Sequence, residues 1–292
     1  MLRNSKFSLL TLIIFLLIII ICNKTQCEAT GTQVSSFNQF SKAIEDNSFL
    51  IEEAFNQEER VVHNIQYATF YKKPCSLLYY SFNQEWPVGG IPHQFSFTVP
   101  YEQVNGLKGI GDISLNYRYQ LTYKDDWALC APRFSIIMPT GKKDPDLFTG
   151  NLGLQINVPA TKRISELIQI HANLGFTYLN NASFRDESIF DNSKNIFSKS
   201  VYNFNTGVGL NIIATGYVNF IFEVIENFNN LPQNRTDNTY INETILVPGV
   251  RFAFNLWTAQ IVPGIGIPFR YLSNSNSGYI GALAYFSVEF PY

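Results

Sequence analysis

The sequence predicts an all-β fold: a transmembrane antiparallel β-barrel of about twelve strands, with a short N-terminal segment below the barrel or inside it. Three observations lead to this prediction: apolar and polar residues alternate, short and long links alternate, and charge is scarce. Charged residues make up 15% of the 292-residue chain and aromatic residues also 15%, whereas a typical soluble domain is about one quarter charged. The net charge of -2 provides no basic surface for nucleic acid.

Residues 1–29 read as a secretory signal peptide. Arg3 and Lys6 precede an apolar run from Leu9 to Cys22, and small residues follow the run, which is the order found in such signals. A permanent membrane anchor and a lipoprotein signal are the alternatives. Because Ile21 and Gln26, which precede the two early cysteines, are large for a lipidation site, we expect plain export, to the outer membrane of a Gram-negative bacterium.

Residues 30–59 form an acidic segment ahead of the first predicted strand. Its acids include Glu52, Glu53 and Glu58, and the stretch from Phe49 to Phe55 carries enough apolar side chains to dock on a surface. Two arrangements fit this composition. The segment is either a loose periplasmic extension or a plug that enters the barrel and meets arginines on the inner wall, such as Arg118 and Arg251.

Alternation with a period of two marks the strands of the barrel domain, residues 60–292. Between Ile113 and Tyr123, apolar side chains at every second position alternate with polar ones, which indicates a strand with one face of each kind. The same pattern predicts strands near residues 60–71, 76–87, 91–101, 110–123, 127–139, 150–159, 165–179, 200–213, 216–227, 243–255, 257–270 and 279–292.

The links between these strands favour a membrane barrel over a soluble sandwich. Short links such as 88–90, 124–126 and 214–215 alternate with longer polar ones, at 102–109, 140–149, 180–199, 228–242 and 272–278. A sandwich also has alternating faces, but it has no reason to keep this rhythm. Outer-membrane barrels do, because their periplasmic turns are short and their outer loops are long.

The barrel interpretation also places the aromatic residues and the chain end. A ring with an apolar body and a polar edge prefers the boundary between lipid and water. Five such residues fall at the periplasmic ends of the predicted strands: Trp86, Tyr123, Trp127, Trp257 and Tyr292. The last strand turns its apolar positions from Ala284 to Tyr292 toward lipid, and it must close against the first strand because an open edge in lipid leaves backbone groups unpaired.

Several stretches resemble those of a known family. They are "FLIEEAFNQEE" (Phe49 to Glu59), "SFNQEWPVG", "KGIGDISLNYRYQL" and "APRFSIIMPTG". Over most of the mature chain the sequence resembles a family of outer-membrane transporters, some of whose members are labelled "MetA-pathway of phenol degradation". The resemblance implies a porin-like barrel for a small solute, hydrophobic or aromatic by that label, and carries no catalytic residues. The alternating last strand also resembles the signal that the barrel-assembly machinery reads.

The inner wall is the expected functional surface. Alternation assigns to it a mixed set of acids, bases and amides: Glu85, Asp112, Arg118, Arg133, Gln155, His171, Asn203, Glu223, Arg251, Arg270 and Glu289. The two readings of this set are a solute path and a filled interior in which the charges pair with one another. The pattern names no solute.

Enzyme chemistry and metal binding find little support. The histidines His63, His93 and His171 form no metal-binding spacing, and none stands beside a serine on its own strand face. We therefore expect no cofactor and no metal, with membrane lipid, the barrel-assembly machinery and a small solute as partners. The alternatives to a channel are an outer-membrane lipid hydrolase and a structural or adhesive surface barrel.

Overall fold

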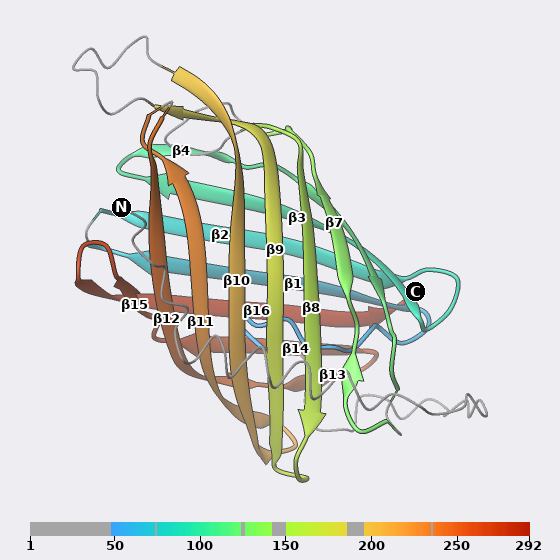
Figure 1. Cartoon of the computed structure of the whole chain (residues 1–292). Coiled ribbons are helices and arrows are strands. Elements are labelled where there is room, and N and C mark those ends of the chain that lie inside the picture. Colours follow the sequence, from blue (N-terminus) through green and yellow to red (C-terminus); the bar gives the residue numbers. More distant parts are fainter. Residues whose placement is uncertain (1–47, 74, 124–125, 142–149, 186–195, 235) are drawn as a thin grey trace.

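The computed structural model describes residues 48–292 except 74, 124–125, 142–149, 186–195 and 235. The predicted signal peptide and residues 30–47 lie outside this part of the chain. The described residues form an antiparallel sheet that closes on itself, as predicted (Figure 1). No helix of the length and apolar character needed to cross a membrane occurs among them.

Sixteen strand segments make up twelve barrel strands. Four barrel strands are each split into two consecutive segments, which lie end to end and pair with the same neighbouring strand. These are β4 and β5 on β3, β6 and β7 on β8, β12 and β13 on β14, and β14 and β15 on β16. The segments are β1 (Val61–Tyr71), β2 (Leu77–Pro87), β3 (His93–Val104), β4 (Leu107–Ile110), β5 (Ser114–Tyr119), β6 (Leu129–Cys130), β7 (Arg133–Ile137), β8 (Gly153–Arg163), β9 (Ile168–Arg185), β10 (Ile196–Thr215), β11 (Val218–Pro232), β12 (Asn238–Phe252), β13 (Phe254–Leu256), β14 (Ala259–Gly266), β15 (Phe269–Leu272) and β16 (Ser277–Pro291).

Prolines mark two of the splits. Pro132 separates β6 from β7, and Pro268 lies between β14 and β15. Proline has no backbone N–H to donate to the next strand, so the hydrogen-bond ladder is interrupted at these positions. The direction of each barrel strand nevertheless continues past the interruption.

The first and last strands close the barrel. β1 pairs antiparallel with β16 in an unbroken register from Val61 opposite Pro291 to Tyr71 opposite Gly281, and Figure 1 shows the two strands side by side. The N–H of Tyr292 donates to the carbonyl of Arg60 at 2.9 Å. The aromatic chain end is therefore held by the seam, which leaves no free sheet edge there.

Alternation divides the wall into an apolar outer face and an inner face. On β7, Phe134 and Ile136 are exposed on the outside while Ser135 between them is fully buried. On β8 the exposed Leu154 and Ile156 precede the buried Asn157 in the same way. An outward apolar belt of this kind is typical of barrels surrounded by lipid.

One of the predicted long links is wrong. Residues 102–109 form a tight hairpin in which β3 and β4 pair around a turn of Asn105 and Gly106. Both turn residues have positive φ, 49° and 92°, as tight two-residue hairpin turns require. β9, β10, β11 and β12 likewise extend into links that were predicted to be loops. Backbone hydrogen bonds continue these strands beyond the apolar alternation that was used to predict them.

The interior contains an apolar cluster as well as polar groups. Its wall members are Ile221 and Ile225 of β11, Val247 of β12, Ala253, Val262 of β14, and Leu283 and Tyr285 of β16. Phe49 and Ile51, from the chain ahead of β1, complete the cluster. The inner wall therefore carries an apolar patch among its polar residues, whereas alternation had assigned it mainly polar residues.

Candidate functional site: the barrel lumen and the segment inside it

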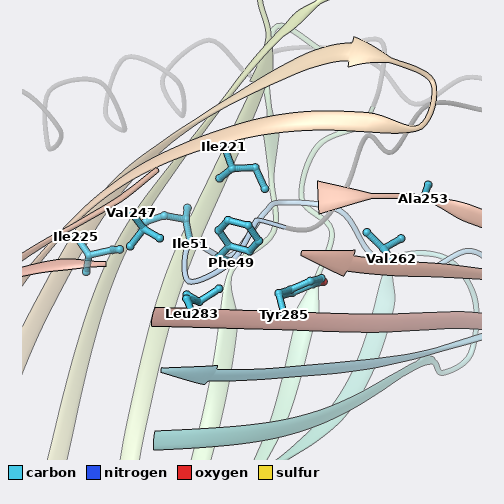
Figure 2. Packing of buried hydrophobic residues seen from close by; sticks show 9 residues of the cluster. All are labelled: Phe49, Ile51, Ile221, Ile225, Val247, Ala253, Val262, Leu283 and Tyr285. Atoms are coloured by element: carbon cyan, nitrogen blue, oxygen red, sulfur yellow. The ribbon is translucent and has the colours of Figure 1, made fainter. Parts of the chain in front are cut away.

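The site consists of the inner wall and the residues Ser48–Gln57, which we call the lumen segment. This segment has no helix or strand of its own. Its contacts run from β3 across the lumen to β16, and Figure 2 shows Phe49 and Ile51 surrounded by side chains from several strands. Most of its side chains are buried. The polar atoms of the segment must therefore find partners on the wall.

Phe49 and Ile51 dock on the apolar side of the wall. The ring of Phe49 lies 5.6 Å from that of Tyr285, tilted by 57°, and it points into the cluster of β11, β12, β14 and β16 (Figure 2). Tilted aromatic pairs at this distance are favourable beyond the area they bury. The apolar half of the segment is thus part of the interior core.

Glycines on the inner wall make room for these two side chains. A Cβ on Gly249 or Gly264 would lie 2.4 or 2.7 Å from the ring of Phe49, and a Cβ on Gly207 would lie 2.2 Å from Cδ1 of Ile51. Any larger residue at these positions would collide with the segment. The wall is therefore shaped to receive the segment.

Glu223 of β11 holds the backbone beside the apolar side chains. Its carboxylate accepts the N–H of Phe49 at 2.8 Å, that of Leu50 at 3.0 Å and that of Ile51 at 3.2 Å. Successive N–H groups directed at one carboxylate form charge-assisted hydrogen bonds, which are stronger than neutral ones. The contact satisfies backbone donors that have no helix or strand partner.

Glu52 lies on the opposite, polar side, between two arginines. Its carboxylate accepts Nε of Arg133 at 2.9 and 3.0 Å and Nη1 of Arg118 at 3.4 Å. Nδ2 of Asn157 donates to it at 2.6 Å. Burial alone would raise the pKa of Glu52, but the charges of Arg133 and Arg118 together with these hydrogen bonds hold that pKa below the ordinary value of 4.5.

The end of the lumen segment binds the wall near β3 and β5. The guanidinium of Arg118 donates to the carbonyls of Glu53, at 3.2 Å, and of Phe55. The backbone N–H of Gln57 donates to Oε1 of Gln94 at 2.7 Å, and that of Asn56 to Gln120 at 2.9 Å. Polar wall residues thus complete the backbone hydrogen bonds of the segment.

Five of the predicted wall residues contribute to this arrangement. Arg118, Arg133 and Glu223 contact the lumen segment directly. Glu85 accepts Nε2 of Gln94 at 2.7 Å and pairs with Arg118 at 3.6 Å. His171 lies 2.9 Å from the hydroxyl of Thr161, which accepts the N–H of Ala54.

The remaining predicted wall residues have other partners, and Arg251 lies close enough to Glu223 to interact with it electrostatically. Gln155 donates to Thr177 at 3.0 Å, and Asn203 accepts the N–H of Asn230 at 3.0 Å. Arg270 pairs with Glu243, Glu289 lies 3.5 Å from His63, and Arg251 is fully buried on β12. Asp112 sits between β4 and β5, where its carboxylate accepts the N–H groups of Gly141 at 2.9 Å and Gly150 at 3.1 Å.

The sequence-based site list missed Glu52 and the wall glycines. Glu52 was noted only as one acid of an acidic segment, because its arginine partners lie 66 and 81 positions further along the chain. The glycines carried a usable signal. Gly207 and Gly209, like Gly264 and Gly266, occupy alternate positions on an inward face, where side chains would otherwise fill the lumen.

The five predicted interface aromatics lie at one rim of the barrel. Trp86 is near the end of β2, Tyr123 follows β5, Trp127 precedes β6, Trp257 lies in the turn from β13 to β14, and Tyr292 follows β16. The antiparallel order places all these strand ends on the same side. Trp257 is completely exposed, and Nζ of Lys162 lies over the ring of Trp127 at 3.1 Å. Their contact with a membrane interface remains a prediction.

The described residues contain no group of three or more His, Cys, Asp or Glu side chains that could hold a metal ion. The histidines are instead engaged with neighbouring side chains. His63 contacts Gln57 at 2.9 Å, and His93 faces outward and contacts the hydroxyl of Tyr117 at 2.6 Å.

Comparisons with known proteins agree with this architecture. No protein-family model and no curated protein matches the chain. Among solved structures, the COG4313 outer membrane channel from Pseudomonas putida F1 superposes with a TM-score of 0.57 at 10% identity, covering 82% of this chain and 98% of that one. The translocator domain of the autotransporter NalP from Neisseria meningitidis gives 0.50 at 9% identity, covering 80% and 87%. At these identities the likeness concerns the fold alone, and the chain has the fold of outer-membrane β-barrels.

Proposed function

We propose that the protein is an outer-membrane channel or transporter for a small solute, and that the lumen segment closes it. The observation that carries this proposal is a segment held across a barrel by two dissimilar sides. On one side, Phe49 and Ile51 pack against apolar wall side chains and over wall glycines. On the other side, the segment binds charged and amide groups of the wall. The polar contacts can be exchanged for hydrogen bonds to water when the segment leaves, which supports a segment that can be displaced.

The two-sided wall also supports a solute with an apolar part. Once the lumen segment leaves, the space of Phe49 and Ile51 is lined by Ile221, Val247 and Val262. Apolar walls with a few placed polar groups are typical of small-molecule sites. A hydrophobic or aromatic solute fits this description.

The proposal includes the route to the membrane. Residues 1–29 would direct export, the apolar outer belt would contact lipid, and the alternating β16 with its final Tyr292 would be read by the barrel-assembly machinery of a Gram-negative host. The one-sided aromatic rim supports the same orientation, with both chain ends in the periplasm.

Lipid hydrolysis and a purely adhesive role are less well supported. The hydrogen-bonded pair of Thr161 and His171 looks like a nucleophile and base, but both side chains are buried and Thr161 already accepts the N–H of Ala54. Such a pair needs access to its substrate. An adhesive barrel would have no use for a segment anchored across its lumen.

A disulfide lock tests the proposal directly. The Cβ of Ile51 lies 3.6 Å from the position of a Cβ on Gly209, within the range that a disulfide requires. We expect Ile51→Cys/Gly209→Cys, in a background with Cys75 and Cys130 changed to Ser, to form a closed barrel. Liposome swelling with small sugars should stop in the oxidised protein and resume after reduction.

The two single-cysteine variants serve as controls and should not respond to reductant. Equal swelling before and after reduction, with the disulfide verified by mass, would show that the lumen segment is not a gate. If the unlocked protein and a variant lacking residues 33–56 both fail to pass any solute or current, the channel proposal itself is wrong.

A further inference from the structure

Two arginines face each other directly on the inner wall. Arg118 of β5 and Arg133 of β7 are opposite partners in the antiparallel register. Like charges in this position repel each other, and the side chain of Arg118 is only 3% exposed, so water screens the repulsion weakly. An anion between or beside the guanidinium groups would therefore stabilise the pair.

The wall itself supplies little of that negative charge. Arg118 lies 3.6 Å from Glu85, whose carboxylate already accepts hydrogen bonds from Asn83 and Gln94. The wall partners of Arg133 are neutral, namely Asn116 at 3.1 Å and Ser135. Within the described chain, the acid paired with Arg133 is Glu52 of the lumen segment.

Glu52 shows what the wall recognises. One carboxylate is bound by Nε of Arg133, Nη1 of Arg118 and Nδ2 of Asn157, and these donors come from three neighbouring barrel strands. A planar guanidinium with a neighbouring amide is well suited to a carboxylate. All these donors belong to the barrel, so they remain in the lumen when the segment is displaced.

We propose that Arg118, Arg133 and Asn157 form a binding site for a carboxylate group of the transported solute, and that Glu52 occupies this site as an internal competitor. The inference rests on the proposed channel function and narrows its solute to organic anions. Binding of such a solute then favours the displaced state of the lumen segment, because only that state leaves the donors available.

The test uses full-length protein in detergent with Leu50→Cys as a reporter of displacement and its native cysteines changed to Ser. The rate of modification by a charged maleimide is measured at pH 7 in benzoate, in benzamide, and in chloride at equal ionic strength. Benzamide has nearly the same shape as benzoate but no charge. We expect benzoate to accelerate labelling at least about fivefold, and benzamide and chloride to have no effect.

Arg133→Gln should label faster than the parent without any further response to benzoate. Arg270→Gln is the matched control, because it removes an inward arginine that pairs with Glu243 instead of Glu52, and it should keep the full benzoate response. Glu52→Gln keeps every wall donor but weakens docking, so a larger fraction of the protein has the lumen segment displaced and the donors free to bind benzoate. The half-maximal benzoate concentration should therefore fall at least about threefold.

Equal rates in benzoate and benzamide, or a benzoate response that survives Arg133→Gln, would overturn the inference. A half-maximal concentration unchanged by Glu52→Gln would do the same, even if the arginine variant failed to fold. The channel proposal is judged separately by the disulfide lock. If solute flux stops in the oxidised disulfide variant and resumes after reduction but shows no preference for benzoate, the channel proposal holds and only the carboxylate site is refuted.

Discussion

Glu52→Gln probes the contact on which closure of the lumen depends most. The substitution keeps the size of the side chain and one oxygen acceptor, but it removes the charge that pairs with Arg133 and Arg118. Glu52 accepts close hydrogen bonds from Arg133 and Asn157 and a longer one from Arg118. We therefore expect the segment to dock less firmly while the barrel stays folded.

The magnitude follows from the partners and their exposure. A hydrogen bond to a charged group contributes about 1.5–3 kcal/mol, and partial exposure of Glu52 and Arg133, 21% and 18%, screens the ion pair. A loss of about 2–3 kcal/mol is reasonable for the docked state. Because 1.4 kcal/mol is a factor of about ten, the displaced fraction should rise about 30- to 150-fold.

The assay is the modification rate of Leu50→Cys, which follows the displaced population when docking is fast relative to labelling. Glu243→Gln is the control, because Glu243 is also an inward acid paired with an arginine but does not contact the segment. A rate for Glu52→Gln within about threefold of the parent would refute the assigned role of the Glu52 contact. An equal increase in Glu243→Gln would refute its specificity.

Three further predictions follow from the same geometry. Gly264→Ala places a Cβ 2.7 Å from the ring of Phe49, so Leu50→Cys should label faster, and the double variant with Phe49→Ala should label no faster than Phe49→Ala alone. Because the pKa of Glu52 is lowered in the docked state, its stabilisation is present above the ordinary pKa of 4.5 and is lost as the pH falls through the docked-state pKa; since only the thiolate reacts with maleimide, the labelling rate of Leu50→Cys is divided at each pH by that of an exposed reference thiol, and this ratio should rise below pH 4.5 in the parent and lose the rise in Glu52→Gln. Phe222→Arg puts a charge on the outer face, where Phe222 is 47% exposed, and should destabilise the barrel in lipid vesicles by about 2–4 kcal/mol, measured by urea unfolding, whereas unchanged stability would contradict a lipid-facing position.

Local pattern was sufficient to predict the barrel wall. Alternation on β7 and β8, the apolar face of β16 and the closing pair of β1 and β16 were all predicted, because the period of two is a property of each strand alone. Strand ends were predicted less well. The turn at Asn105 and Gly106 lies where the apolar pattern has ended, although the Asn-Gly pair is itself a hairpin signal.

The contents of the lumen were decided by the closed structure. Sequence indicated that residues 30–59 were acidic and partly apolar and that a plug would meet Arg118, but it could not choose between a plug and a loose extension. That choice depends on Arg118, Arg133, Glu223 and the wall glycines, which come from strands far apart in the chain. Only closure of the sheet brings them around one space, because a strand's own sequence specifies which face points inward but not which side chains it will meet there.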